Sequence, residues 1–215
     1  MKLYQSIGPN PRLVLMYLAE TSLQLERAMV DIKKGENRDP AHLARNPLGH
    51  TPVLELDDGS CLSESVAICE YLDETRNDNA LMGSTPEERA KTRMLVRIVD
   101  QQVVVPMTMA FRGAEGHAMF KDRLLCLPGA AEDLKRQGQA GLEIVDGLIG
   151  PGPFLAGERF SLADALLYAF VEFGAVIGQP PAERLANLAA WRARVAERPS
   201  AAASANPKQG IAEAA

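Results

Sequence analysis

The stretch NPLGHTPVLELDDGSCLSES, residues 46–65, decides the fold of the first third of the chain. Two short apolar runs, 53–56 and 60–62, flank the sequence Asp-Asp-Gly at 57–59. An Asp-Gly pair between apolar runs is a strong signal for a β-hairpin, because both central residues of the favoured turn need positive φ. The stretch therefore predicts two antiparallel strands.

Polar anchor points lie at both ends of this hairpin. A proline restricts the residue before it to extended backbone, so Thr51 should be extended ahead of Pro52, and this X-Pro bond can be cis at modest cost. Extended backbone offers an N–H and a C=O to a peptide-like ligand. Glu64 and Ser65 lie at the start of a predicted helix, 65–74, where free amides and the helix dipole favour a carboxylate. A turn proline and a serine-capped helix remain the alternative explanation.

Short strands and helices alternate ahead of this hairpin. The pattern predicts strands at 2–5 and 26–32 and helices at 11–20 and 40–45. The order βαβ, helix, ββα implies a small mixed sheet with one parallel crossover and one hairpin.

The composition then changes to that of a helical protein. A polar, turn-rich segment precedes Thr85-Pro86, which starts a helix well because threonine caps and proline fits the first helical position. The predicted fold class is α/β followed by all-α. The predicted domains are 1–76, α/β; 77–85, linker; 86–200, all-helical; and 201–215, a low-complexity tail.

Charge and composition argue against several classes of protein. A net charge of -5 and a pI near 5.3 provide no basic surface for nucleic acid or an anionic membrane. Apolar runs such as 162–171 are too short to span a bilayer, and no signal peptide follows Lys2, so we expect a cytoplasmic protein. The three cysteines lack the spacing of a zinc site, which predicts reduced thiols and no metal.

The segment NPLGHTPVLELDDGSCLSESVAICEYLDE, 46–74, closely resembles the N-terminal signature of the glutathione transferase family. The resemblance extends over the chain, through KLYQSIGPNPRLVLMYLAE at 2–20, FLAGERFSLADALLYAF at 154–170 and WRARVAERPS at 191–200. It implies a thioredoxin-like N-terminal domain, a helical C-terminal domain and often a homodimer. It also implies glutathione as the co-substrate, with no bound cofactor.

The resemblance implies a role for each anchor point. Thr51 would pair with the cysteinyl backbone of glutathione beside a cis Pro52, and Glu64 and Ser65 would hold its γ-glutamyl end. His50 stands where a polar side chain often meets the glycyl carboxylate. A solvated loop histidine is an equal alternative for His50.

The residues at the positions that activate the thiol differ from those of the main classes of the family. A free thiol with a pKa of about 8.5 is only a few per cent ionised near pH 7, so a donor near the first helix must stabilise the thiolate. Gln5 stands where some classes have tyrosine, and Ile7 and Gly8 stand near the serine of others.

Asn10 is the first candidate for this donor. It aligns with the cysteine of the beta-like bacterial class, and GPNPR resembles the nu-like run in which asparagine contacts the sulfur. Asn10 before Pro11 also fits a helix N-cap, a competing role for the same side chain. Ser6 is the reserve candidate, with a strand-end serine in a turn as its structural alternative.

The electrophile pocket is expected between the domains, on the helix that contains Pro106. Met107, Met109 and Phe111 would form adaptable apolar walls, although methionines and aromatics on a helix are more often core. Pro106 should kink this helix.

A further motif, Ser161 to Asp164, predicts a reciprocal capping box at a helix start. We assign it a structural role.

The leading hypothesis is an enzyme that transfers the glutathione sulfur to a small apolar electrophile. Two alternatives remain open. One is a glutathione-dependent disulfide reductase of the nu-like type, and the other is a noncatalytic glutathione-binding or protein-interaction domain.

Overall fold

The computed structural model describes residues 1–76 and 81–205. Two compact units are present: residues 1–84 together with the segment that begins at Arg198, and Thr85–Glu197. Part of the predicted linker, 77–80, and the end of the predicted tail, 206–215, lie outside the described residues.

The first unit is built on a four-stranded mixed sheet, with the strand order β2-β1-β3-β4. Its strands are β1 (Lys2–Gln5), β2 (Glu26–Met29), β3 (Val53–Glu55) and β4 (Cys61–Ser63). β1 runs parallel to β2, whereas β3 is antiparallel to both β1 and β4. The predicted parallel crossover and hairpin are both confirmed.

Two strand details differ from the sequence prediction. β2 ends at Met29 because Asp31 turns the chain, its carboxylate accepting hydrogen bonds from the amides of Lys33 and Lys34. In the hairpin only Gly59 has positive φ, at 85°, and residues 57–59 form a three-residue loop. Such loops place one left-handed residue at the end of an ordinary turn, so the second positive φ is not needed.

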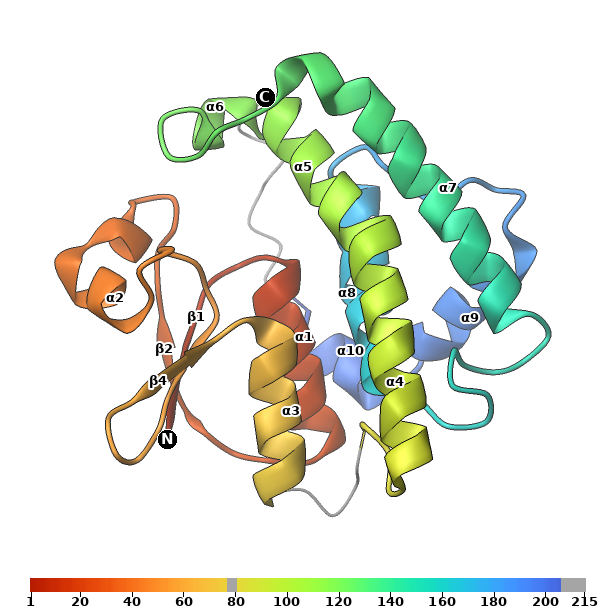
Figure 1. The fold of residues 1–215 in the computed structure, drawn as a ribbon, viewed down its shortest axis with the longest axis horizontal. Helices are drawn as coiled ribbons and strands as arrows, with labels where there is room; N and C mark the ends of the chain where they lie inside the picture. Colours follow the sequence, from red (N-terminus) through yellow and green to blue (C-terminus); the bar gives the residue numbers. More distant parts are fainter. Residues whose placement is uncertain (77–80, 206–215) are drawn as a thin grey trace. The chain divides into compact units, whose positions relative to one another are not determined.

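The helices of the first unit pack on its sheet. α1 (Pro9–Glu20) and α3 (Ser65–Arg76) lie side by side on one face, and α2 (Pro40–Arg45) lies on the other side (Figure 1). A short 3-10 turn, η1 (Glu36–Arg38), precedes α2. The core between α1, α3 and the sheet contains fully buried apolar side chains, among them Leu3, Leu13, Tyr17, Leu54 and Ile68.

The start of α1 corrects one prediction. The helix begins at Pro9, two residues earlier than expected, so its N-cap is Gly8 with a φ of 132°. No side chain caps this end, and Asn10 is the second helical residue. The N-cap interpretation of Asn10 is therefore wrong.

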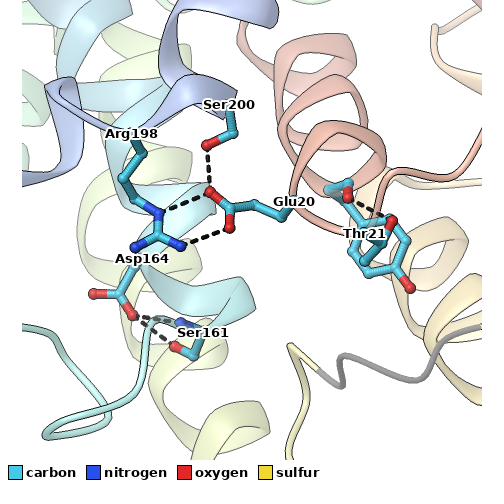
Figure 2. Close-up of polar contacts among 7 residues, drawn as sticks. Glu20, Thr21, Ser161, Asp164, Arg198 and Ser200 are labelled. Carbon is cyan, nitrogen blue, oxygen red and sulfur yellow. Dashed lines mark hydrogen bonds and ion pairs between the residues drawn. The ribbon is translucent and has the colours of Figure 1, made fainter.

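The last described helix, α10 (Pro199–Ala203), packs against α1 and belongs to the first unit. Arg198 donates to both carboxylate oxygens of Glu20, at 2.7 and 2.6 Å, and Ser200 donates to the same carboxylate (Figure 2). Residues 201–203, expected in a low-complexity tail, are therefore helical, because this anchor fixes the segment and Ala201 is buried.

The second unit begins with one continuous helical run. It consists of α4 (Pro86–Val99), a π-helical turn η2 (Asp100–Val104) and α5 (Val105–Gly113). The Thr85 hydroxyl accepts from the Glu88 amide, which confirms the predicted threonine cap, and the Glu88 side chain accepts from the Thr85 amide in return. Pro106 has no amide hydrogen to donate to the carbonyl of Gln102. The π turn contains Gln102 and ends just before Pro106.

The other helices of the second unit are α6 (His117–Phe120), η3 (Pro128–Ala130), α7 (Ala131–Ile149), α8 (Leu162–Val176) and α9 (Ala186–Ala196). Residues 162–171 of α8 are all buried, which explains why this helix is apolar on every side. The run Pro86–Gly113 is long and apolar enough by composition to cross a membrane. Half of its most apolar window is buried in the protein, and a single such helix is weak evidence for a membrane span.

Asp164 organises the start of α8. One of its carboxylate oxygens accepts from the amide and the hydroxyl of Ser161, at 3.0 and 2.7 Å (Figure 2). The other accepts from the Leu155 amide and the Trp191 indole, both at 2.9 Å. The predicted capping box is present. Burial raises the pKa of Asp164, although these hydrogen bonds oppose the rise.

Candidate functional site

The N-termini of α1 and α3 lie together in the first unit. The hydroxyl of Ser65, in the first turn of α3, donates to Oδ1 of Asn10, in the first turn of α1, at 3.1 Å. Ser65 is buried and Asn10 is partly exposed. The amides of a first helical turn have no acceptor within the helix, and the dipole makes this end positive. Two such ends close together form a favourable place for anions.

Glu64 stands directly before α3 in a left-handed conformation, with a φ of 70°. Its carbonyl accepts the first helical hydrogen bond, from Ile68, at 3.0 Å. A left-handed backbone is uncommon for a residue other than glycine and costs about 1 to 3 kcal/mol. The sequence carries no signal for this conformation, because glutamate has no preference for it.

Thr51 and Ser6 meet at the end of the sheet where β1 stops and β3 begins. The Thr51–Pro52 peptide bond is cis. The hydroxyls of Ser6 and Thr51 are 2.5 Å apart, and the Ser6 hydroxyl also donates to the carbonyl of Ile7 at 3.0 Å. A hydroxyl has one proton, so Thr51 is the donor of the shorter bond. Ser6 is buried.

The loop before Thr51 is held by side chains of η1, α2 and the residue after α2. Its carbonyls at 48, 49 and 50 all accept side-chain hydrogen bonds. The donors are Arg38 to Leu48 at 3.2 Å, Asn37 to Gly49 at 2.7 Å, and His42 and Asn46 to His50 at 3.0 and 3.1 Å. Because a carbonyl can only accept, Nε2 of His42 carries the proton.

Three of these donors, Asn37, His42 and Asn46, are buried. They fix the backbone that leads into Thr51, so they position the site without belonging to its surface. Sequence reasoning missed Asn37 and His42, because the bonds span 12 and 8 positions and no local pattern marks them. Asn46 entered the sequence analysis only as the first residue of the stretch 46–65.

The three residues predicted for the electrophile pocket all lie on α5 of the second unit. Met107 is 2% exposed, and its methyl group lies 2.8 Å from the position that a Cβ on Gly174 would occupy. Phe111 is also buried and meets Phe173 edge-on, with ring centroids 5.2 Å apart. Met109 is partly exposed. Met107 and Phe111 are thus parts of the helical core, the alternative stated for such residues.

Within residues 1–76 and 81–205, no group of three His, Cys, Asp or Glu side chains is arranged to hold a metal ion. Cys69 is fully buried, and burial raises the pKa of its thiol well above 9.0, with smaller contributions from Asp73 and Glu70. A neutral, enclosed thiol is inert, as expected for a packed cysteine.

Comparison with known proteins identifies the chain. Residues 1–74 match the glutathione S-transferase N-terminal domain, and residues 129–199 match the glutathione S-transferase C-terminal domain. The chain belongs to the glutathione S-transferase family. Like its relatives that carry this name, it is a transferase with a thioredoxin-like and a helical domain, and the family binds glutathione.

Two relatives and one solved structure illustrate how far this likeness extends. Glutathione S-transferase 2 of Saccharomyces cerevisiae is 31% identical over 197 residues, 90% of this chain and 84% of that protein. The crystal structure of Gtt2 from Saccharomyces cerevisiae has a TM-score of 0.88 at 29% identity, over 95% of this chain and 100% of that chain. Maleylacetoacetate isomerase of Pseudomonas aeruginosa is 36% identical over 170 residues, 73% of this chain and 74% of that protein.

Proposed function

We propose that this transferase conjugates the sulfur of glutathione to a small apolar electrophile, without a metal or an organic cofactor. The thiolate forms a carbon–sulfur bond, the leaving group departs with its electron pair, and the thiol proton passes to solvent. The hydrogen bond between Asn10 and Ser65 carries this proposal. It brings the candidate hydrogen-bond donor to the sulfur next to the residue proposed to bind the γ-glutamyl carboxylate.

Glutathione would bind along the first unit. The backbone of Thr51 pairs with the cysteinyl residue as an added strand would. The hydroxyl of Ser65 and the first amides of α3 hold the γ-glutamyl carboxylate, while the carboxylate of Glu64 takes the ammonium group. His50, in the loop held by η1 and α2, is assigned to the glycyl carboxylate.

Asn10 is the proposed donor to the sulfur. Its Oδ1 accepts from Ser65, and within the described part of the chain its Nδ2 has no hydrogen-bond partner, so two hydrogens remain for a thiolate. The proton of the reserve candidate, Ser6, is directed at the carbonyl of Ile7 instead. The geometry therefore favours Asn10 over Ser6.

The energies are sufficient for this role. Lowering a thiol pKa by about two units requires roughly 2.7 kcal/mol of preferential thiolate stabilisation. A hydrogen bond to a charged group contributes about 1.5 to 3 kcal/mol, and the helix dipole adds about 0.3 to 1 kcal/mol. One side-chain amide donor at the start of α1, together with the helix dipole, therefore supplies about the free energy that this pKa shift requires.

Steady-state kinetics with glutathione and chlorodinitrobenzene test the proposal. Asn10→Ala should lower kcat/KM at least tenfold, while Ser6→Ala should change it less. Asn10→Ala removes no helix cap, since Gly8 occupies that position, so folding should be retained. Wild-type protein that binds glutathione but turns over no electrophile would favour the noncatalytic binding domain.

Isomerisation is a second candidate, because a maleylacetoacetate isomerase is among the relatives. A thiolate that adds to a double bond and leaves again would perform it with the same groups. The third reaction of a thiolate is attack on a disulfide, as in the nu-like alternative. Assays with a dinitrobenzene halide, a cis-alkene diacid and a small disulfide separate the three.

We further propose that the protein works as a cytoplasmic homodimer, the arrangement usual in this family. Sedimentation equilibrium tests the dimer, and a mass equal to one chain would exclude it.

A further inference from the structure

The backbone carbonyl of His50 accepts two hydrogen bonds from buried side chains of the first unit. Nε2 of His42, on α2, lies 3.0 Å from this oxygen, and Nδ2 of Asn46 lies 3.1 Å from it. His42 is 3% exposed and Asn46 is 2% exposed. A carbonyl oxygen has two lone pairs, so these two donors satisfy it completely. They fix the peptide group between residues 50 and 51 on the side that faces α2.

Both donors are committed to this carbonyl. Nδ1 of His42 is buried and has no hydrogen-bond partner within residues 1–76 and 81–205, so the ring uses its single N–H for the bond to His50. The carboxamide of Asn46 is held in its orientation by the amide of Leu48, which donates to Oδ1 at 3.1 Å. Neither side chain can turn away without leaving a buried polar group unpaired.

The same peptide group contains the amide of Thr51. The bond between His50 and Thr51 is trans, so its N–H points opposite to the carbonyl and away from α2. This amide donates to no acceptor in the part of the chain that the structure describes, while the Thr51 hydroxyl donates to Ser6. Hydrogen bonds to a carbonyl polarise its peptide group and strengthen the N–H as a donor. Thr51 therefore presents a fixed and polarised amide.

The loop that carries this amide is closely packed on η1. Gly49 has a φ of 63°, and a Cβ at this position would lie 2.9 Å from the carbonyl oxygen of Asn37. The side chain of Asn37 donates to the carbonyl of Gly49 at 2.7 Å. A donor that is held in place before a ligand arrives binds it without the cost of ordering a loop.

We propose that His42 is a positioning residue for glutathione. Through the His50 carbonyl it holds the Thr51 amide toward the cysteinyl carbonyl of the ligand, and so sets the affinity for glutathione without taking part in the chemistry of the sulfur. The inference rests on the proposed pairing of Thr51 with glutathione. It adds a buried residue that controls this pairing without touching the ligand.

Binding of S-methylglutathione tests the inference, because this ligand keeps the peptide backbone of glutathione but has no thiol and cannot be conjugated. His42→Phe keeps a ring and removes the donor, and calorimetry should show about five- to tenfold weaker binding, the effect of losing one hydrogen bond. His42→Gln retains an N–H at the position of Nε2 and should bind like the wild type.

A control on the same helix separates this bond from general loosening of α2. Arg45→Gln removes the bond from α2 to Glu55, at 3.3 Å, and leaves the loop carbonyls with their donors. Its affinity for S-methylglutathione should equal that of the wild type. Thermal unfolding of each variant shows that the protein measured is folded.

Kinetics separate positioning from a purely structural role. His42→Phe should raise KM for glutathione by the factor seen in calorimetry, while kcat at saturating glutathione and the pKa of the bound thiol stay at the wild-type values. A change that only destabilised the fold would lower the active fraction, and with it kcat, and leave KM unchanged.

Equal affinity for S-methylglutathione in the wild type and His42→Phe would overturn the inference. The same loss in His42→Phe and His42→Gln would also overturn it, because packing of the ring rather than its hydrogen bond would then be responsible. The binding result is obtained whether or not the protein turns over an electrophile, so a failure of the proposed conjugation is recognised separately.

Discussion

Asn10 and Ser65, 55 positions apart, are joined by a hydrogen bond of 3.1 Å that links the first turns of α1 and α3. Each residue belongs to a different anchor of the proposed glutathione site, one for the sulfur and one for the γ-glutamyl end. When a carboxylate arrives, the Ser65 hydroxyl can turn from Asn10 toward it, because a charged acceptor is the stronger partner.

Substitution of Ser65 tests the proposed binding of the γ-glutamyl carboxylate. Ser65→Ala should weaken glutathione binding by roughly 1.5 to 3 kcal/mol, the contribution of a hydrogen bond to a charged group. Calorimetry measures the difference. Ser60→Ala is the control, since Ser60 is an exposed hairpin residue bonded to Asp58, and its affinity should equal that of the wild type. Equal affinity in the Ser65 variant would remove this residue from the site.

The hydrogen bonds from Arg198 and Ser200 to Glu20, which fix α10, predict a pH-dependent contribution to stability. Burial alone raises the pKa of Glu20, but hydrogen bonds from Arg198 and Ser200 and the charge of Arg198 outweigh it and hold the pKa below 4.5. A folded-state pKa below the unfolded value stabilises the protein above the unfolded pKa, and this contribution is lost as pH falls through the folded value.

Glu20→Gln should therefore lower the free energy of unfolding near pH 7 by about 1 to 3 kcal/mol. The difference from the wild type should shrink as the pH falls below 4.5. Glu26→Gln, which breaks the exposed pair with Lys2, serves as the control and should have little effect. Urea titrations across this pH range measure both variants, and a difference that does not vary with pH would show that the anchor is not ionic.

Close approach of α7 to the π turn predicts opposite effects at two glycines of one helix. A Cβ on Gly141 would lie 1.9 Å from the carbonyl oxygen of Gln102, whereas nothing lies within 4 Å of a Cβ on Gly147. Gly141→Ala should destabilise the protein by roughly 1 to 3 kcal/mol, because the helices must separate. Gly147→Ala should stabilise it by up to about 1 kcal/mol through helix propensity. Thermal unfolding that gave both variants the same sign would contradict the close contact.

Local chemistry made much of the fold predictable. The Asp-Gly pair marked the hairpin, and the Thr85-Pro86 sequence marked the start of α4, because the signals for both lie within a few residues. The hydrogen bonds from Asn37 and His42 to the loop carbonyls at 49 and 50 depend on the packing of a separate helix, which no short pattern reveals.

The candidate site was predictable to a similar extent. The resemblance to a family implied a cis bond at Pro52, and the Thr51–Pro52 bond is cis. The glutathione-binding roles of Thr51 and Ser65 remain predictions. The role of Asn10 depended on where α1 begins, and Gly8 rather than Asn10 proved to be the N-cap.

The most direct test of the central claim is the pKa of glutathione bound to the protein, measured by ultraviolet thiolate absorbance against pH in the wild type, Asn10→Ala and Ser6→Ala. If Asn10 donates to the sulfur, the wild type should show a thiol pKa well below the free value of about 8.5, because the charged form gains the hydrogen bond. Asn10→Ala should raise that pKa by one unit or more, and Ser6→Ala should leave it low. A lowered pKa that neither substitution changes would assign the effect to backbone amides and the helix dipole. A wild-type pKa equal to that of free glutathione would contradict thiolate activation altogether.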